Sequence, residues 1–177
     1  MKRITGIFFL CCMVSAPAYA VDGIAFTGGS GSDADLATVS LTWNWDKRWF
    51  TEGDWSLGGY WELSGTAWKG DGPRPEKELY GIGIAPVFRF QRNAFANSIS
   101  PYAEVGVGAY QFSGKQIHGE QSMGSRFEFG THIGLGMTFG DRQQFDVSYR
   151  IQHFSNAGIT STNPGINFNE IRIGYHF

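Results

Sequence analysis

Two residues near the end of the chain, His153 and Ser155, have the types and the spacing that ester hydrolysis requires. They lie two positions apart in a segment that alternates apolar and polar side chains, and this spacing places both on one face of a β-strand. The other side chains on that face are apolar: Phe145, Val147, Tyr149 and Ile151. A serine hydroxyl becomes an effective nucleophile when a hydrogen-bonded imidazole accepts its proton. We therefore interpret the pair as a nucleophile and its base on an apolar surface.

The N-terminal segment has the organisation of a secretory signal peptide. Lys2 and Arg3 precede an apolar stretch over residues 7–14, and the small-x-small sequence Ala-Tyr-Ala follows at 18–20. We expect cleavage after Ala20, which makes residues 1–20 the signal peptide and residues 21–177 the secreted domain.

The remaining composition narrows the chemistry of the secreted domain. Cys11 and Cys12 both lie in the predicted signal peptide, so a disulfide framework and cysteine-ligated metals are excluded. The formal charge moves from −2 to −4 once Lys2 and Arg3 are removed, and no basic patch indicates a nucleic-acid partner. No metal or other cofactor is expected.

The secreted domain has the pattern of an outer-membrane β-barrel. It is rich in glycine and aromatic residues, and after residue 20 it has no apolar run of about 18 residues that could span a membrane as a helix. Barrel strands appear as segments of about 10 residues with alternating hydrophobicity, joined by turn residues. Eight such segments occur, at 21–30, 35–45, 55–68, 79–91, 101–113, 126–139, 144–155 and 167–177. An even number is typical of single-chain bacterial barrels, so we predict an all-β, eight-stranded, antiparallel, up-and-down transmembrane barrel.

The alternation also predicts a filled, polar interior. Within 126–139, apolar side chains such as Phe129, Ile133 and Leu135 share one face, while Glu128 and His132 are on the other. Charged residues on the inward face of the eight segments include Glu62, Arg89, Glu104, Glu128, Asp146, Arg150 and Arg172. The lumen of an eight-stranded barrel is just wide enough for side chains to fill, so we expect a compensated ionic network rather than a conducting pore.

The lengths of the connections orient the barrel. The turn at 140–143 is short, whereas the loops at 70–77, 114–124 and 156–166 are longer, as is typical of periplasmic turns and extracellular loops respectively. Alternating apolar residues ending in Phe177 also fit the terminal strand of such a barrel. The seventh segment then carries His153 and Ser155 to the extracellular rim, facing the lipopolysaccharide of the outer leaflet. Ester-linked acyl chains of lipid A are the substrate class expected there.

An imidazole base needs a third group that fixes its tautomer. On the eighth segment Ile171 and Ile173 face outward, so Asn167 also faces outward and Glu170 faces the lumen. We predict that the amide oxygen of Asn167 orients His153. A β-bulge after Phe168 would reverse this assignment in favour of Glu170.

These residues resemble the outer-membrane lipid A 3-O-deacylases of the PagL family over essentially the whole secreted domain. The specific match is HFSNAG at 153–158, and similar stretches are WNWDKRWF at 43–50, APVF at 85–88 and PYAEVGVGAY at 101–110. The resemblance implies an eight-stranded barrel with a metal-free serine hydrolase site on its lipid face. It implies release of the 3-hydroxyacyl chain that is ester-linked at position 3 of lipid A.

Carried over by position, the resemblance makes Ser155 the nucleophile and His153 the base. The family typically has a Glu as the acid two residues beyond a Gly, and this chain has Asn167 in that place, after Gly165. The resemblance also implies an oxyanion hole formed by the backbone N–H of Gly158 and the side chain of Asn163. Two such donors suit acyl transfer.

Two other functions remain open at this point. In a non-catalytic small barrel with an adhesive or structural role, the His and Ser would merely lie in the polar interfacial zone. In an outer-membrane phospholipase, the same residues would act on glycerophospholipid, although the chain is too short for the twelve strands of the larger phospholipase A. The sequence leaves open whether the protein forms a homodimer.

Overall fold

The computed structural model describes residues 20–32, 34–70, 78–93, 99–118, 121–161 and 165–177. The described residues form ten strands: β1 (Gly23–Gly31), β2 (Ala34–Asn44), β3 (Trp55–Gly70), β4 (Glu78–Arg92), β5 (Ile99–Phe112), β6 (Gln116–His118), β7 (Gln121–Ser122), β8 (Phe127–Phe139), β9 (Phe145–Ser155) and β10 (Ile166–His176). The eight long strands match the eight predicted segments to within a few residues. The short strands β6 and β7 were not predicted.

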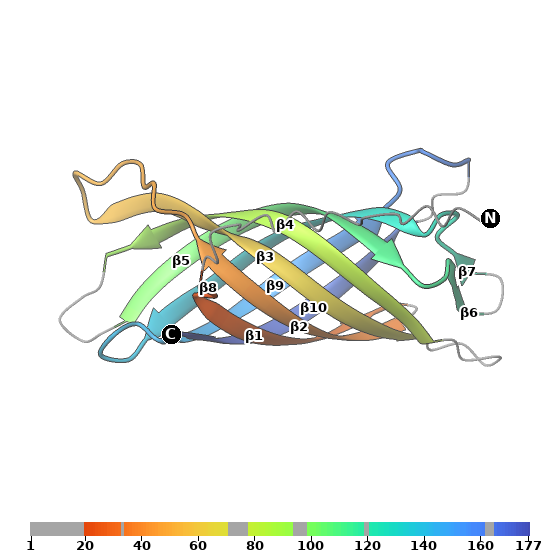
Figure 1. Ribbon diagram of the computed structural model, residues 1–177, viewed down its shortest axis with the longest axis horizontal. Coiled ribbons are helices and arrows are strands. Elements are labelled where there is room, and N and C mark those ends of the chain that lie inside the picture. Colours follow the sequence, from red (N-terminus) through yellow and green to blue (C-terminus); the bar gives the residue numbers. More distant parts are fainter. Residues whose placement is uncertain (1–19, 33, 71–77, 94–98, 119–120, 162–164) are drawn as a thin grey trace, which may run out of the picture.

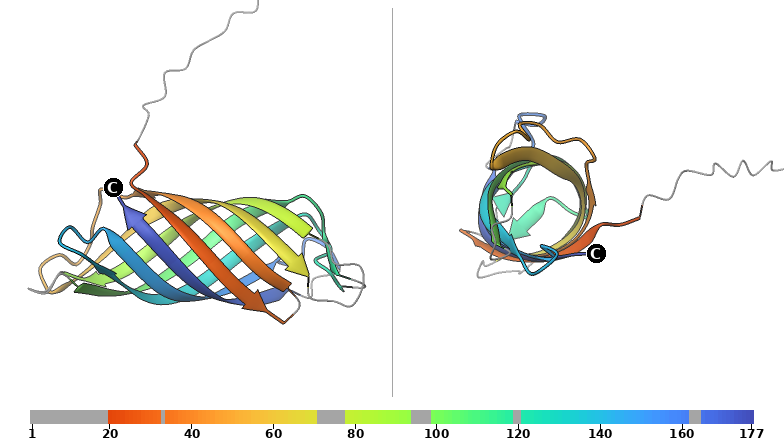
Figure 2. Two further views of the ribbon diagram at one scale, coloured as in Figure 1. Left: turned by 90° about the horizontal axis from the view of Figure 1, so that it is seen from below. Right: turned by 90° about the vertical axis from the view of Figure 1, so that its left-hand side faces the viewer.

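The eight long strands close into a barrel in the order β1-β10-β9-β8-β5-β4-β3-β2. Every neighbouring pair is antiparallel, and β1 closes the sheet against β10 (Figure 1). Seen from one end, the sheet forms a complete ring (Figure 2). Closure gives each of these strands a partner on both sides, which satisfies backbone groups that lipid could not. The predicted eight-stranded up-and-down barrel is confirmed.

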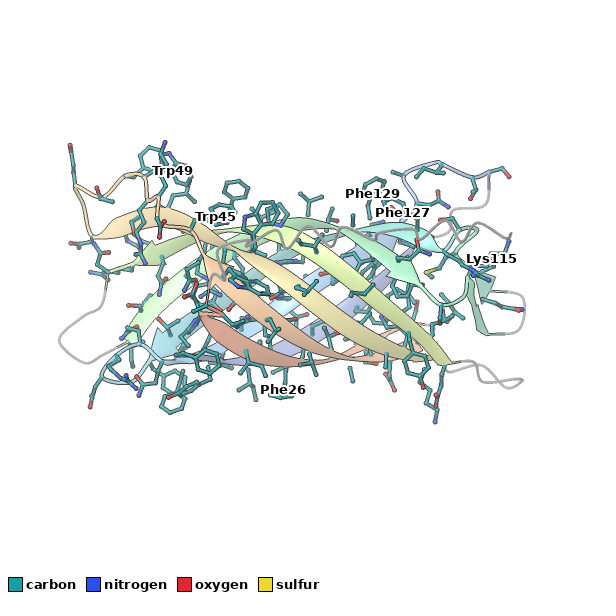
Figure 3. The ribbon with its side chains drawn as sticks, viewed as in Figure 1. Phe26, Trp45, Trp49, Lys115, Phe127 and Phe129 are labelled. Atoms are coloured by element: carbon teal, nitrogen blue, oxygen red, sulfur yellow. The ribbon has the colours of Figure 1, made fainter. Side chains whose placement is uncertain are left out.

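The exterior of the barrel is apolar, as the alternation requires. Phe26 projects outward from β1 (Figure 3), and exposed aliphatic side chains such as Ile133, Leu135 and Ile173 continue this surface on other strands. Within the described residues, no helix is long and apolar enough to cross a membrane. A side-chain surface of this kind is stable in contact with acyl chains rather than water.

Ion pairs fill the middle of the lumen. Arg89 contacts Glu104 at 2.9 Å and Asp146 at 2.8 Å, and Arg150 contacts Glu104 at 2.8 Å and Glu62 at 3.2 Å. Arg172 lies 3.3 Å from Asp146 and 3.4 Å from Glu62, which links the pairs into one network. The predicted compensated interior is therefore present. Glu128 is the exception, because it is buried away from these arginines and accepts a hydrogen bond from Ser125.

The lumen contains a second layer, which the sequence reading did not predict. Five inward-facing rings gather at the end of the barrel opposite the C-terminus: Trp68, Tyr110, Phe112, Phe154 and Phe168. We call them the aromatic plug. Trp68 is 1% exposed, and its ring centroid lies 4.8 Å from that of Phe154 and 4.9 Å from that of Phe168. The hairpin β6–β7 lies at this end (Figure 1), and Ile117 of β6 and Met123, directly after β7, belong to the same buried cluster.

The two ends of the barrel differ. The short turn at 140–143 lies at the end that holds the C-terminus (Figure 1), together with Trp45 and Trp49 (Figure 3). The opposite end carries the segment 156–161, the β6–β7 hairpin and the side chains of Phe127 and Phe129. We refer to it as the loop end. His153 and Ser155 are the last outward-facing residues of β9 and therefore lie at the loop end.

Replacing Trp68 by Ala is expected to destabilise the barrel strongly, because it removes the central ring of the aromatic plug. Truncation of a buried tryptophan costs about 3 to 5 kcal/mol. Trp61 lies on the same strand but faces outward and is 46% exposed, so Trp61→Ala is the matched control and should cost much less. Urea unfolding in detergent, followed by tryptophan fluorescence, measures both. Equal losses would mean that the plug contributes no special stability.

Candidate active site

The C-terminal end of β9 and the N-terminal start of β10 lie side by side and carry the predicted site residues. His153 pairs with Asn167 in the strand register, and both side chains are exposed on the outer surface. The residues that directly follow them, Phe154 and Phe168, point inward and are buried in the aromatic plug. Because side chains alternate between the two faces of a strand, burial of these phenylalanine rings in the lumen turns the neighbouring polar side chains outward.

A direct contact joins the predicted base to its predicted partner. His153 Nδ1 lies 2.7 Å from Asn167 Oδ1. Because an amide oxygen only accepts hydrogen bonds, Nδ1 donates, and the neutral ring presents the lone pair of Nε2 for proton transfer. This is the tautomer that a serine hydrolase needs. The strand parity argument predicted this contact, and the structure has it.

Ser155 is the last residue of β9, paired with Phe129 of β8, and its side chain is partly exposed on the same face as His153. In the part of the chain that the structure describes, no hydrogen bond joins Ser155 Oγ to His153. Catalytic hydrogen bonds are often long before substrate binds.

Glu170 occupies the other side of the sheet. Its side chain is buried in the lumen, at 5% exposure, and its strand partner is Arg150. The pairing of β9 with β10 runs without a shift from Ile166 to Tyr175, so no bulge turns Glu170 outward. The alternative in which Glu170 orients His153 is therefore incompatible with this register.

Asn156, directly after Ser155, organises the start of the following segment, and the sequence reading overlooked it. Its side chain is completely buried, and its Nδ2 donates to the carbonyl of Met123 at 3.0 Å and to Thr160 Oγ1 at 2.8 Å. Its Oδ1 accepts from the backbone N–H of Gly158 at 3.0 Å. The predicted oxyanion donor Gly158 is thus already hydrogen-bonded. An Asn two residues before a Gly is a signal for such a turn.

The turn itself places two residues in the left-handed region. Ala157 has φ 51° and Gly158 has φ 82°, and the N–H of Ile159 donates to the carbonyl of Asn156 at 3.0 Å. Left-handed φ at both central positions is the geometry of a type I′ turn. It directs the chain sharply away from the end of β9 and leaves Ser155 at the edge of the outer surface.

Two sequence predictions fall outside the described residues. The first concerns Asn163, the other predicted oxyanion donor, and the second concerns the predicted signal peptide, of which residues 1–19 are not described. Both stay predictions. Among the described residues, no group of three His, Cys, Asp or Glu side chains is placed to hold a metal ion.

The geometry defines a class of protein: a small membrane barrel with a histidine and a serine on its apolar exterior, at one rim. Residues 35–176 match the family described as lipid A 3-O-deacylase (PagL). The lipid A deacylase PagL of Pseudomonas aeruginosa is 35% identical over 170 residues, covering 94% of each chain. The lipid A deacylase PagL of Bordetella bronchiseptica is 33% identical over 175 residues, covering 95% of this chain and 90% of the relative.

Solved structures agree with the sequence relatives. A crystal structure of the outer-membrane enzyme PagL superposes with a TM-score of 0.75 at 30% identity, covering 86% of this chain and 98% of that one. Neisserial surface protein A reaches a TM-score of 0.50 at 13% identity, a likeness of fold alone. The chain therefore belongs to the lipid A 3-O-deacylase (PagL) family. It is an ester hydrolase of the bacterial outer membrane.

Asn156→Ala should loosen the segment after Ser155, because it removes three hydrogen bonds from a buried position. Leaving buried partners unsatisfied costs about 1 to 3 kcal/mol. Limited proteolysis of the folded barrel should then cut within 156–161 faster than in the parent protein. Ser161→Ala, in the same segment but exposed, is the control and should leave the cleavage rate unchanged. Identical rates in all three proteins would contradict the role given to Asn156.

Proposed function

We propose that this protein removes the 3-hydroxyacyl chain that is ester-linked at position 3 of lipid A, from the outer leaflet of the outer membrane. Ser155 acts as the nucleophile, His153 as the general base and Asn167 as the group that orients His153. The observation that carries the proposal is the 2.7 Å contact between His153 and Asn167 on the outer face of the barrel, with Ser155 two residues further along that face. Membership of the deacylase family supports the substrate.

The chemistry follows from these positions. Ser155 Oγ attacks the ester carbonyl carbon while its proton moves to His153 Nε2, and a tetrahedral oxyanion forms. The oxyanion collapses, the bond to the glucosamine oxygen breaks, and the imidazolium returns its proton to that oxygen. Water then attacks the acyl-serine by the same route in reverse and releases the free 3-hydroxy fatty acid. The substrate reaches the site laterally through the outer leaflet, because the reactive side chains lie on the exterior.

The oxyanion hole is proposed to use the backbone N–H of Gly158 and the side chain of Asn163. The Gly158 N–H donates to Asn156 Oδ1 at 3.0 Å in this structure, so it must exchange that acceptor for the oxyanion when the tetrahedral intermediate forms. The exchange is favourable because an N–H bond to a charged oxygen is roughly twice as strong as one to a neutral amide.

Lipid A mass spectrometry of cells that express the protein tests the proposal. The parent protein should remove one 3-hydroxyacyl mass, and Ser155→Ala should abolish this loss, because it removes the hydroxyl that is proposed as the nucleophile. Ser148→Ala, a buried serine on the inward face of the same strand, is the matched control for folding and should keep activity if the barrel forms. A difference in gel migration between heated and unheated samples of each variant verifies that its barrel is folded.

Other outcomes identify other functions. Loss of a fatty acid from glycerophospholipid that depends on Ser155 would establish a phospholipase instead. Unchanged lipids in cells with correctly folded parent protein would favour the adhesive or structural barrel. The homodimer that the sequence left open gains no support from the relatives.

Variants at position 167 test the orienting residue. Asn167→Ala removes the acceptor of one hydrogen bond from His153, so the deacylation rate should fall on the order of 10-fold. Asn167→Glu should preserve or raise the rate, because a carboxylate stabilises the imidazolium better than a neutral amide does. Initial rates on purified lipid A in detergent measure both. A folded, inactive Asn167→Glu barrel together with a fully active Asn167→Ala barrel would remove Asn167 from the site.

A further inference from the structure

Gly165, immediately before β10, lies against the imidazole of His153. Its φ of 66° is in the left-handed region. A Cβ atom added at this position would lie 2.7 Å from His153 Cε1 and 3.3 Å from Nε2, and 3.3 Å from the carbonyl oxygen of Phe154. The first distance is shorter than a van der Waals contact allows. Any other residue at 165 would therefore have to move the ring or the backbone.

The ring has little freedom to move away. Its Nδ1 is held by Asn167 Oδ1 at 2.7 Å, and its Cα is fixed in the paired part of β9. The added Cβ would press on the edge between Cε1 and Nε2, which carries the nitrogen that accepts the proton of Ser155. A rotation that relieves the contact would break the bond to Asn167 or turn Nε2 away from Ser155.

We infer that Gly165 is a positioning residue for the deacylation reaction: the absence of a side chain forms the seat in which the His153 ring reaches Asn167 and still presents Nε2 to Ser155. This inference rests on the proposed function of Ser155 and His153. It assigns Gly165 a role in addition to its left-handed turn.

The inference links Gly165 to the residue at 167. The Asn167 side chain is one carbon shorter than a Glu side chain would be, and its 2.7 Å contact with Nδ1 accompanies the close approach of the imidazole to Gly165. A Glu at 167 would hold the ring further from the strand. Gly165 and Asn167 should therefore be energetically coupled, as residues that share one contact generally are.

The test separates the steric effect of an added Cβ on the His153 ring from the cost of the left-handed backbone conformation. Gly165→Ala has both the added Cβ and an unfavourable left-handed φ, whereas Gly165→Asn tolerates that φ but still carries the Cβ. Gly140 provides the matched control, since its φ is 94° in the turn at the opposite end and an added Cβ there would meet only the flexible end of Gln144. Gly140→Ala and Gly140→Asn report the cost of the left-handed region alone.

We expect both Gly165 variants to lower kcat on the order of 10- to 100-fold, the effect of misplacing a reacting group by about 1 Å. Both Gly140 variants should keep the parent kcat. In the Asn167→Glu background, Gly165→Ala should cost clearly less. Nitrogen-15 spectra of the His153 ring should show the Nδ1–H tautomer in the parent and its loss in Gly165→Ala.

Three results would overturn the inference: a fully active Gly165→Asn barrel, an unchanged His153 spectrum in Gly165→Ala, or equal costs of Gly165→Ala in the two backgrounds at 167. If the Gly165 variants do not fold, the spectrum and the rate of Asn167→Glu/Gly165→Ala decide, because the longer side chain relieves the contact. Failure of the proposed function is distinguishable, since deacylation would then survive Ser155→Ala.

Discussion

The register between β9 and β10 is the constraint on which the site depends. It places His153 directly opposite Asn167, and a slip of either strand by one residue would turn that strand's polar side chain into the lumen. The aromatic plug holds this register from inside, because Phe154 and Phe168 pack on Trp68 from the two neighbouring strands. Each outward polar residue is thus flanked by a buried ring, and the barrel wall gives the site its rigidity.

The lumen is filled by ion pairs in its middle and by aromatic rings at the loop end. In its middle, three arginines and three carboxylates neutralise one another through short contacts, a buried arrangement that is tolerable only because each charge has partners. At the loop end the filling is aromatic, and the β6–β7 hairpin lies there (Figure 1). Closely packed rings there tie the strands behind the candidate site to each other.

The neutral residue that we propose to orient His153 has a physical rationale on a surface that faces lipid. An unpaired carboxylate is costly to hold near acyl chains, whereas an amide carries no net charge. In the proposed site, Asn167 would therefore hold the tautomer of His153 at a lower desolvation cost than Glu, but it would stabilise the imidazolium less. Glu170 cannot compensate, because it is buried on the opposite side of the sheet and faces Arg150 in the register.

Sequence alone determined the barrel, its eight long strands, the outward face shared by His153 and Ser155, and the pairing of His153 with Asn167. These follow from the two-residue period of a strand, which a linear pattern records directly. Only the tertiary structure decided the aromatic plug, the hydrogen bond that occupies the N–H of Gly158, and the contact between Gly165 and His153. Each of these depends on distances between residues that the chain brings together by closing the sheet, and no local pattern encodes such distances.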